Sequence, residues 1–254
     1  MHYVQVKGIL SAKNGMNLYR GCSHGCIYCD SRSSCYQMPH AFEDIEVKQN
    51  ALVLLEEALR RKRKKCMIDT GSMTDPYIPL ETELGSVRQA MELVYKYGCG
   101  FTVLTKSDRI LRDLDLLQKI NASAKCVVQM TLTTYDEELC KKIEPYVSTT
   151  RERFEALKQL RDAGIPTVVW LAPILPFIND TEANLRGILD YCIEAGVYGI
   201  ICFGMGLTLR DGNREYFYQQ LDRHFPRLKK RYIDTYGNQY VIDLSLIHIS
   251  EPTR

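Results

Sequence analysis

An alternation of two apolar patterns along most of the chain constrains its fold most strongly. The first pattern has apolar residues at helical spacing and predicts helices over residues 51–59, 87–95, 110–120, 154–160, 185–193 and 214–225. The second is a short continuous apolar run of strand length, found at residues 15–20, 66–70, 100–105, 126–132, 166–174 and 199–203. Apolar strands that alternate with helices form a parallel sheet covered by helices. We therefore predict an α/β fold, a partial (β/α)6 barrel, with a doubly wound open sheet as the alternative.

Composition limits the class of protein further. The 254 residues, 45% of them apolar and 25% charged, suit one globular domain. A net charge of +2 gives no independent argument for a nucleic-acid partner. The sequence has neither an apolar run of about 18 residues nor an export signal, so we expect no membrane partner and a cytoplasmic location. In that reducing compartment the ten cysteines need a core, metal or redox explanation.

The last residues of the chain, 244–254, have a different origin in our interpretation. Their sequence, LSLIHISEPTR, matches one reading frame of a transposon-library adaptor strand. We therefore expect a single native domain over residues 1–243, with its true C-terminus missing, and a non-native tail over 244–254. Resequencing unamplified source DNA across the junction would refute this if it returned the same codons.

Three cysteines directly after the first predicted strand form a C-x3-C-x2-C pattern: Cys22, Cys26 and Cys29. Three thiolates on a short loop can hold a metal but cannot close a tetrahedral site alone. A structural zinc site would need a fourth ligand, which His24, Cys35 or His40 could supply. An iron–sulfur cluster with one iron left open needs no fourth protein ligand, and thiolates are the usual ligands of such clusters. Buried, inert thiols are the third alternative.

The motif and its surroundings resemble the radical S-adenosylmethionine (SAM) superfamily, in which an aromatic residue precedes the last cysteine, as Tyr28 does here. Residues 17–22, 30–33, 71–77 and 105–108 resemble its branch related to spore photoproduct lyase, often labelled DNA repair photolyase. The resemblance runs from about Tyr19 to Asp180. It covers most of the chain. Its cysteine motif is highly specific for the superfamily, whereas membership of the branch says far less about the substrate.

The resemblance implies a 4Fe–4S cluster on the three cysteines and SAM bound through its amino and carboxylate groups to the fourth iron. An electron from the cluster would cleave the sulfonium to methionine and a 5′-deoxyadenosyl radical, which would take hydrogen from an unidentified substrate. A flavodoxin or ferredoxin is the kind of reductant implied. Nucleic acid is the substrate class suggested by the family, and the reaction is lyase-like.

The resemblance also assigns cofactor contacts at the strand ends. Lys106 would pair with the SAM carboxylate, Thr131 would offer a hydroxyl, and the loop after the second strand would face SAM through Ser72, Thr74 and Asp75, with Tyr28 from the cysteine motif. Each of these also has a structural interpretation. A lysine can simply end a strand, threonines fill strands well, and Asp75-Pro76 is a common turn.

One residue departs from the branch pattern. Spore photoproduct lyases carry a Cys-Thr-Ser-Asp run that aligns with residues 72–75 here, and their cysteine returns a hydrogen atom to the product radical. This chain has Ser72 instead, and a serine O–H is a far poorer hydrogen-atom donor. The difference argues against spore photoproduct repair, with Cys35 or Cys66 as the substitutes that the sequence offers.

Three weaker signals complete the sequence interpretation. Asn179 with Glu182 has the pattern of a helix capping box, and residues 204–206 (Gly-Met-Gly) could allow close approach to an adenine. The basic run 60–65 is typical of a solvated helix end, with nucleic-acid contact as the functional alternative. That run and the cysteines together support the other function we consider, a zinc-stabilised nucleic-acid-binding module.

Overall fold

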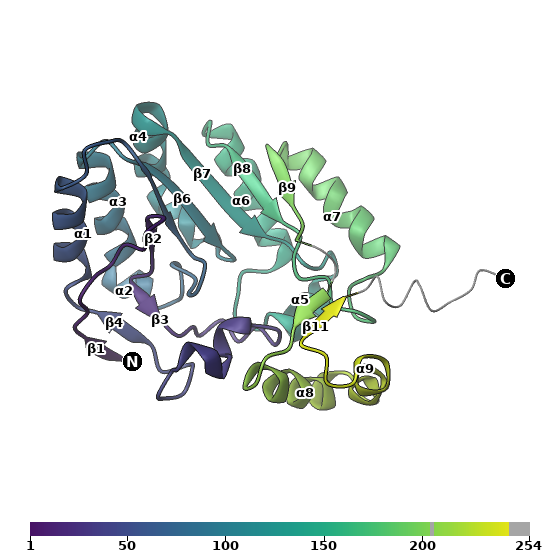
Figure 1. The fold of residues 1–254 in the computed structure, drawn as a ribbon. Helices are drawn as coiled ribbons and strands as arrows, with labels where there is room; N and C mark the ends of the chain where they lie inside the picture. The colour runs from purple at the N-terminus through teal and green to yellow at the C-terminus, as the bar shows by residue number, and fades with distance from the viewer. Residues whose placement is uncertain (204–205, 244–254) are drawn as a thin grey trace.

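A computed structural model describes residues 1–203 and 206–243. Its centre is a six-stranded parallel sheet in which strand order follows chain order (Figure 1). The strands are β2 (Gly15–Met16), β5 (Met67–Thr70), β6 (Gly100–Thr105), β7 (Cys126–Thr131), β8 (Thr167–Trp170) and β9 (Gly199–Ile201). β2 and β9 are not paired with each other, so the sheet stays open and the predicted partial barrel is confirmed. The predicted non-native tail, 244–254, lies outside the described residues.

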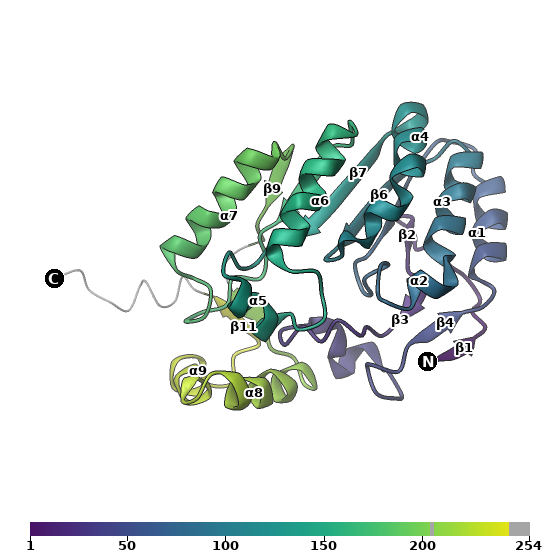
Figure 2. The ribbon, with the colours of Figure 1, turned by 180° about the vertical axis from the view of Figure 1, so that it is seen from behind.

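Helices cover one face of this sheet, which is the near face in Figure 2 and the far face in Figure 1. They are α1 (Ala51–Arg60), α3 (Ser86–Lys96), α4 (Leu114–Ala124), α6 (Thr150–Asp162) and α7 (Glu182–Ala195). Leu55, Met91 and Leu117 on the helices and Phe101 and Val128 on the strands have no exposed surface. Each such side chain contributes about 1.5–3 kcal/mol of burial free energy. No helix among the described residues is long and apolar enough to cross a membrane.

The prediction of one strand over 15–20 is wrong. The chain leaves the main sheet after β2 and forms β3 (Tyr19–Arg20) in a separate sheet, where β3 pairs antiparallel with β4 (Glu46–Lys48) and β1 (His2–Val4) pairs parallel with β4. The Tyr19 hydroxyl donates a 2.5 Å hydrogen bond to buried Glu81, which holds the chain away from the main sheet. The cysteine motif therefore follows the small sheet rather than a barrel strand.

Three other predicted elements differ in detail. The helix expected over 110–120 starts as a 3-10 segment, η3 (Asp108–Asp113), before α4. The strand expected over 166–174 ends at Trp170, because Pro173 and Pro176 cannot donate ladder hydrogen bonds. The capping box of Asn179 with Glu182 is wrong: Thr181 caps α7 through the Asn184 amide, and Asn179 instead holds the Leu175 amide.

A second, smaller core lies below the sheet in Figure 1. The C-terminal helices α8 (Asn213–His224) and α9 (Leu228–Tyr236) pack there, with the strand pair β10 (Gly206–Thr208) and β11 (Val241–Asp243). Cys26, Ile27 and Tyr28 belong to the same core, so the C-terminal region supports the cysteine motif directly. The remaining short elements are η1 (Asp30–Arg32), η2 (Ser34–Tyr36), α2 (Glu81–Leu84) and α5 (Glu137–Ile143).

Candidate functional site

The cysteine loop is held on both sides by backbone hydrogen bonds. The Cys22 amide donates to the Phe42 carbonyl at 3.0 Å, and the Ile27 amide donates to Ile143 at 3.0 Å. Two glycines permit this path: Gly21 has a φ of +85°, and Gly25 has a φ of +70°. A Cβ at Gly21 would lie 2.5 Å from the Phe42 carbonyl oxygen. The loop position is therefore fixed by its neighbours.

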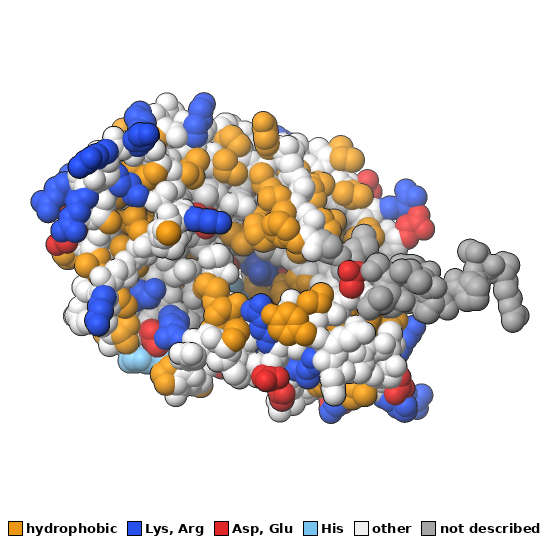
Figure 3. Space-filling model, in the orientation of Figure 1, with side chains coloured by type: hydrophobic (Ala, Val, Ile, Leu, Met, Phe, Trp, Pro, Cys, Tyr) orange, Lys and Arg blue, Asp and Glu red, His pale blue; other side chains and the backbone are white. Residues whose placement is uncertain are grey.

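The three cysteines line a cavity of about 130 Å³ between this loop and the carboxyl ends of β5 and β6. Four further residues assigned to cofactor binding share the cavity: Tyr28, Ser72, Asp75 and Lys106. Among the described residues, Thr74 and Thr131 are buried but do not line it. Figure 3 shows this face of the molecule hollowed near its middle, with basic side-chain atoms inside the hollow.

Asp75 connects three parts of the cavity wall. Its carboxylate accepts hydrogen bonds from the Thr105 hydroxyl at 2.8 Å and from the Lys106 amide at 2.7 Å. It also accepts a 2.8 Å bond from the Tyr77 amide within its own loop. The Nδ1 atom of His24 lies 3.5 Å away from its Oδ2. Asp75 thus fixes the end of β6 relative to the cysteine loop.

His24 lines the cavity, although the sequence analysis considered this residue only as a zinc ligand. Its side chain is 2% exposed, and within the described part of the chain its Nε2 atom has no hydrogen-bond partner. Burial lowers the pKa of His24, so the imidazole is neutral at pH 7. An unsatisfied buried polar atom costs about 1–3 kcal/mol. A group bound in the cavity would remove this cost.

Lys106 brings positive charge to the cavity. Across the described residues its ammonium makes no hydrogen bond or ion pair, and it lies 5.9 Å from the centre of the Tyr28 ring. Burial alone would lower the pKa of Lys106, but Cys26 and Glu144 outweigh this effect and raise it. The lysine is therefore a charged group available to an anionic ligand.

A fully buried ion pair supports the cysteine loop through contact with Tyr28. Arg153 lies 2.6 Å from Glu144, and neither side chain is exposed. The Tyr28 hydroxyl donates to Glu144, so only the ring of Tyr28 remains for a cofactor. Arg153 donates to the Thr131 carbonyl at 2.7 Å, which gives Thr131 a structural role. The charge of Arg153 keeps the pKa of Glu144 low although burial acts in the opposite direction.

The protonation of the thiols depends on a bound metal. Burial raises the pKa of Cys22 to about 12 and that of Cys26 well above its ordinary value. Without a metal both thiols are protonated at pH 7, and metal binding must release their protons.

The spacing of the three sulfurs bears on the kind of metal. Thiolates about 2.3 Å from one tetrahedral zinc lie about 3.8 Å apart. Among the described residues, the group of three ligand atoms that all lie within 4.8 Å of one another is His2, His40 and Glu46, so the cysteine sulfurs are spread more widely. A single tetrahedral zinc ion would therefore require these sulfurs to move closer together.

Three residues considered as zinc ligands or hydrogen-atom donors lie elsewhere. Cys35 lines a separate cavity beside Arg210, and His40 contacts Glu46. Cys66 precedes β5 at the opposite end of the sheet, with its sulfur 3.4 Å from that of Cys99. Neither proposed donor cysteine lines the cavity of Ser72. Of the predicted adenine-contacting residues, Gly204 and Met205 lie outside the described residues.

The fold is a partial α/β barrel, and three cysteines line a cavity at the carboxyl ends of its strands. The chain belongs to the radical SAM superfamily, whose family model matches residues 16–192. Membership implies a 4Fe–4S cluster, SAM and a source of electrons.

Known relatives agree with this placement. An uncharacterized protein of Mycobacterium tuberculosis is 30% identical over 232 residues, which are 87% of this chain and 66% of the relative. One of Methanocaldococcus jannaschii is 32% identical and is covered to 65%. The chain thus spans about two thirds of the length of these relatives.

Solved structures of spore photoproduct lyase share the fold. One variant superposes with a TM-score of 0.63 at 17% identity, over 89% of this chain and 68% of that protein. Another, with bound AdoMet and dinucleoside spore photoproduct, superposes with a TM-score of 0.59 at 16% identity, over 83% of this chain and 60% of that protein.

Proposed function

We propose that this chain binds a 4Fe–4S cluster on Cys22, Cys26 and Cys29 together with SAM, and that it removes a hydrogen atom from a nucleic-acid substrate. The observation that carries the proposal is the shared cavity, where the three thiols meet the His24 imidazole and the Lys106 ammonium. Among the described residues, the Nε2 atom of His24 has no hydrogen-bond partner and the ammonium has no ion pair. The ammonium fits an anionic group of a ligand beside a cluster, and the free imidazole nitrogen fits a polar group of that ligand. When bound, the cluster and SAM supply the electron and the carbon radical for hydrogen abstraction.

The protein's own residues position these groups and limit access to them. We assign Lys106 to the carboxylate of SAM, because a buried charge-assisted pair of this kind is strong. Asp75 keeps the Lys106 amide in place, and Ser72 offers a hydroxyl beside it. The buried Glu144–Arg153 pair holds Tyr28 and thereby the loop between Cys26 and Cys29. Thr74 and Thr131 would act through the backbone that they support rather than through direct contact.

The substrate class is a proposal by analogy, supported by the fold shared with spore photoproduct lyase. Ser72 stands where that enzyme has its hydrogen-donating cysteine, so we propose a different reaction on a related substrate. The basic run 60–65 links α1 to the start of β5 and thus lies at the end of the sheet opposite the cavity. Nucleic acid bound in the cavity would therefore not use this run. We propose a flavodoxin or ferredoxin as the reductant and a cytoplasmic location.

The test is an anaerobic assay of the full chain. The protein is reconstituted with iron and sulfide, reduced with dithionite and mixed with SAM, and 5′-deoxyadenosine and methionine are measured by mass spectrometry. We expect both products from the wild type and from Cys126→Ala, a control for a buried cysteine on β7. We expect neither product from Cys26→Ala. A protein that binds no iron, and that binds zinc in the wild type but not in Cys26→Ala, would instead favour the zinc module.

A further inference from the structure

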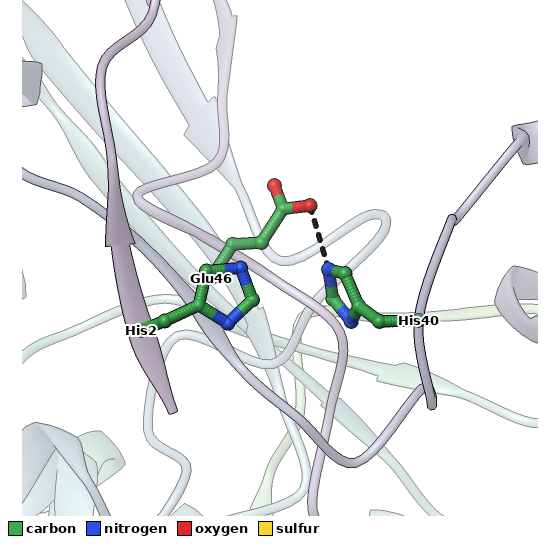
Figure 4. A group of neighbouring side chains, drawn as sticks. All are labelled: His2, His40 and Glu46. Carbon is green, nitrogen blue, oxygen red and sulfur yellow. Dashed lines mark hydrogen bonds and ion pairs between the residues drawn. The ribbon is translucent and has the colours of Figure 1, made fainter.

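A second group of potential metal ligands lies on the small sheet, away from the cysteine cavity. His2 on β1 pairs in register with Glu46 on β4, and His40 approaches from the loop that precedes β4 (Figure 4). One ligand atom from each of the three residues lies within 4.8 Å of the other two. His40 Nε2 and Glu46 Oε1 are 2.9 Å apart. Two imidazoles and one carboxylate thus converge on one point.

The outer contacts of both imidazoles match those of metal-bound histidines. A metal-ligating histidine usually donates its other ring N–H to a carboxylate or a backbone carbonyl. The Nδ1 atom of His2 lies 3.0 Å from the Asp44 carboxylate, and that of His40 lies 3.1 Å from the Ala41 carbonyl. Because Nδ1 is engaged in this way in both rings, Nε2 is the atom that each ring would offer to a metal. In His40 this atom contacts Glu46 at 2.9 Å, and a metal would replace that contact. This arrangement is an observation independent of the three-residue cluster.

The charges around the group allow a cation. Glu46 and Asp44 are the nearby acids, and their present partners include Arg20, 3.5 Å from Glu46, and the amino group of Met1, 3.0 Å from Asp44. The other terminal nitrogen of Arg20, Nη2, donates to backbone carbonyls, one of them that of Tyr36 at 2.6 Å. Arg20 is therefore anchored beside Glu46 and shares its carboxylate with His40.

We propose that His2, His40 and Glu46 bind one divalent transition-metal ion of the zinc type. A donor set of two histidines and one carboxylate suits zinc and leaves one coordination position to water. The ion would fasten the loop that carries His40 to β1 and β4. Because Phe42 on this loop accepts the hydrogen bond of the Cys22 amide, the ion would also steady the start of the cysteine loop.

Zinc itself is the probe for the test. The full chain, with a C-terminal tag and its iron–sulfur cluster reconstituted, is incubated with zinc, dialysed and analysed for zinc and iron. We expect one zinc per wild-type chain, and loss of zinc with unchanged iron in His40→Ala and Glu46→Gln. His224→Ala, at the end of α8, is the matched control and should keep its zinc. Cys26→Ala should lose iron and keep zinc, which separates this site from the cysteine cavity.

Two further measurements make the assignment specific. The zinc X-ray absorption spectrum of the loaded chain should show only nitrogen and oxygen ligands, without sulfur at about 2.3 Å. Asp44→Asn should weaken zinc binding by about 10–100-fold, as expected for an outer-shell partner. Circular dichroism of each variant shows whether its fold is intact. A wild-type chain without zinc, zinc retained in folded His40→Ala, or sulfur in the spectrum would overturn the proposal.

Discussion

The two ends of the parallel sheet contain the same kinds of residue in opposite environments. At the carboxyl ends of β5 and β6, thiols and Lys106 surround a cavity in which His24 Nε2 has no hydrogen-bond partner within the described part of the chain. At the amino ends, Cys66 and Cys99 contact each other and the basic run 60–65 follows the exposed end of α1. The difference indicates that place in the βα unit, rather than residue type alone, decides which cysteines and lysines line the cavity.

The largest effect should come from the cysteines themselves. We expect Cys26→Ala to abolish cluster assembly, because the loop then offers only two thiolates. Cys99→Ala, at the other end of the sheet, should bind as much iron as the wild type. Iron and sulfide analysis with the visible spectrum measures both. Full iron content in Cys26→Ala would contradict the ligand assignment.

A large loss of stability should follow when the buried ion pair behind the loop is broken. Arg153→Met leaves Glu144 charged and unpaired in the interior, which costs about 3–5 kcal/mol. Arg61→Met removes an exposed pair with Glu57 and should leave the free energy of unfolding unchanged. Urea unfolding of both variants gives the comparison. If Arg153→Met were as stable as Arg61→Met, the buried pair would contribute little to the free energy of unfolding.

Substituting the lysine in the cavity and substituting a lysine in the basic run should affect SAM binding differently. Lys106→Ala removes a buried charge-assisted contact, and we expect SAM to bind about 10- to 100-fold more weakly with the cluster intact. Lys64→Ala, in the basic run, should bind SAM as the wild type does. Anaerobic equilibrium dialysis with labelled SAM measures both affinities. Unchanged affinity in Lys106→Ala would remove this residue from the site.

Thiol burial predicts a smaller, pH-dependent effect on the cluster-free chain. Burial raises the pKa of Cys22 to about 12. In the unfolded chain, a thiol has a pKa of about 8.5. The unfolded chain therefore loses this proton first as pH rises. The contribution of this thiol to the free energy of unfolding is fully present below about pH 8.5. Above that pH, the free energy of unfolding falls by about 1.4 kcal/mol per pH unit for such a thiol.

The matching control compares buried and exposed thiols. Urea unfolding of the chelator-treated chain from about pH 7 to about pH 10 should show a flatter decline in Cys22→Ala than in the wild type. Cys35→Ala lacks an exposed thiol and should keep the wild-type slope. Identical slopes in all three proteins would show that Cys22 is not buried as described.

The sequence predicted the sheet and its helices because strongly periodic segments carry their own signal. Residues 87–95 and 100–105, for example, correspond closely to α3 and β6. The small sheet was missed because β1, β3 and β4 have two or three residues each, too few to show an alternation. The strand order of this small sheet depends on pairing between residues far apart in the chain, such as His2 with Glu46.

The site was only partly predictable for a similar reason. Lys106 follows β6 directly, so its place in the chain indicated the cavity. The cysteine motif was recognised by its spacing, although it follows β3 of the small sheet. Glu144 and Arg153 look like ordinary surface residues in the sequence, and only the tertiary fold brings them together without exposure. The unpartnered nitrogen of His24 likewise depends on packing, although its place between two ligand cysteines was a signal.

The measurement that most directly tests the central claim is electron paramagnetic resonance of the reconstituted, reduced full chain before and after SAM is added. We expect the signal of one reduced 4Fe–4S cluster per chain, and we expect SAM to change its shape in the wild type. At the same SAM concentration, Lys106→Ala should show the cluster signal with little change. A chain without a cluster signal, or with a signal that SAM leaves unaltered, would contradict the proposal that this cavity holds both groups.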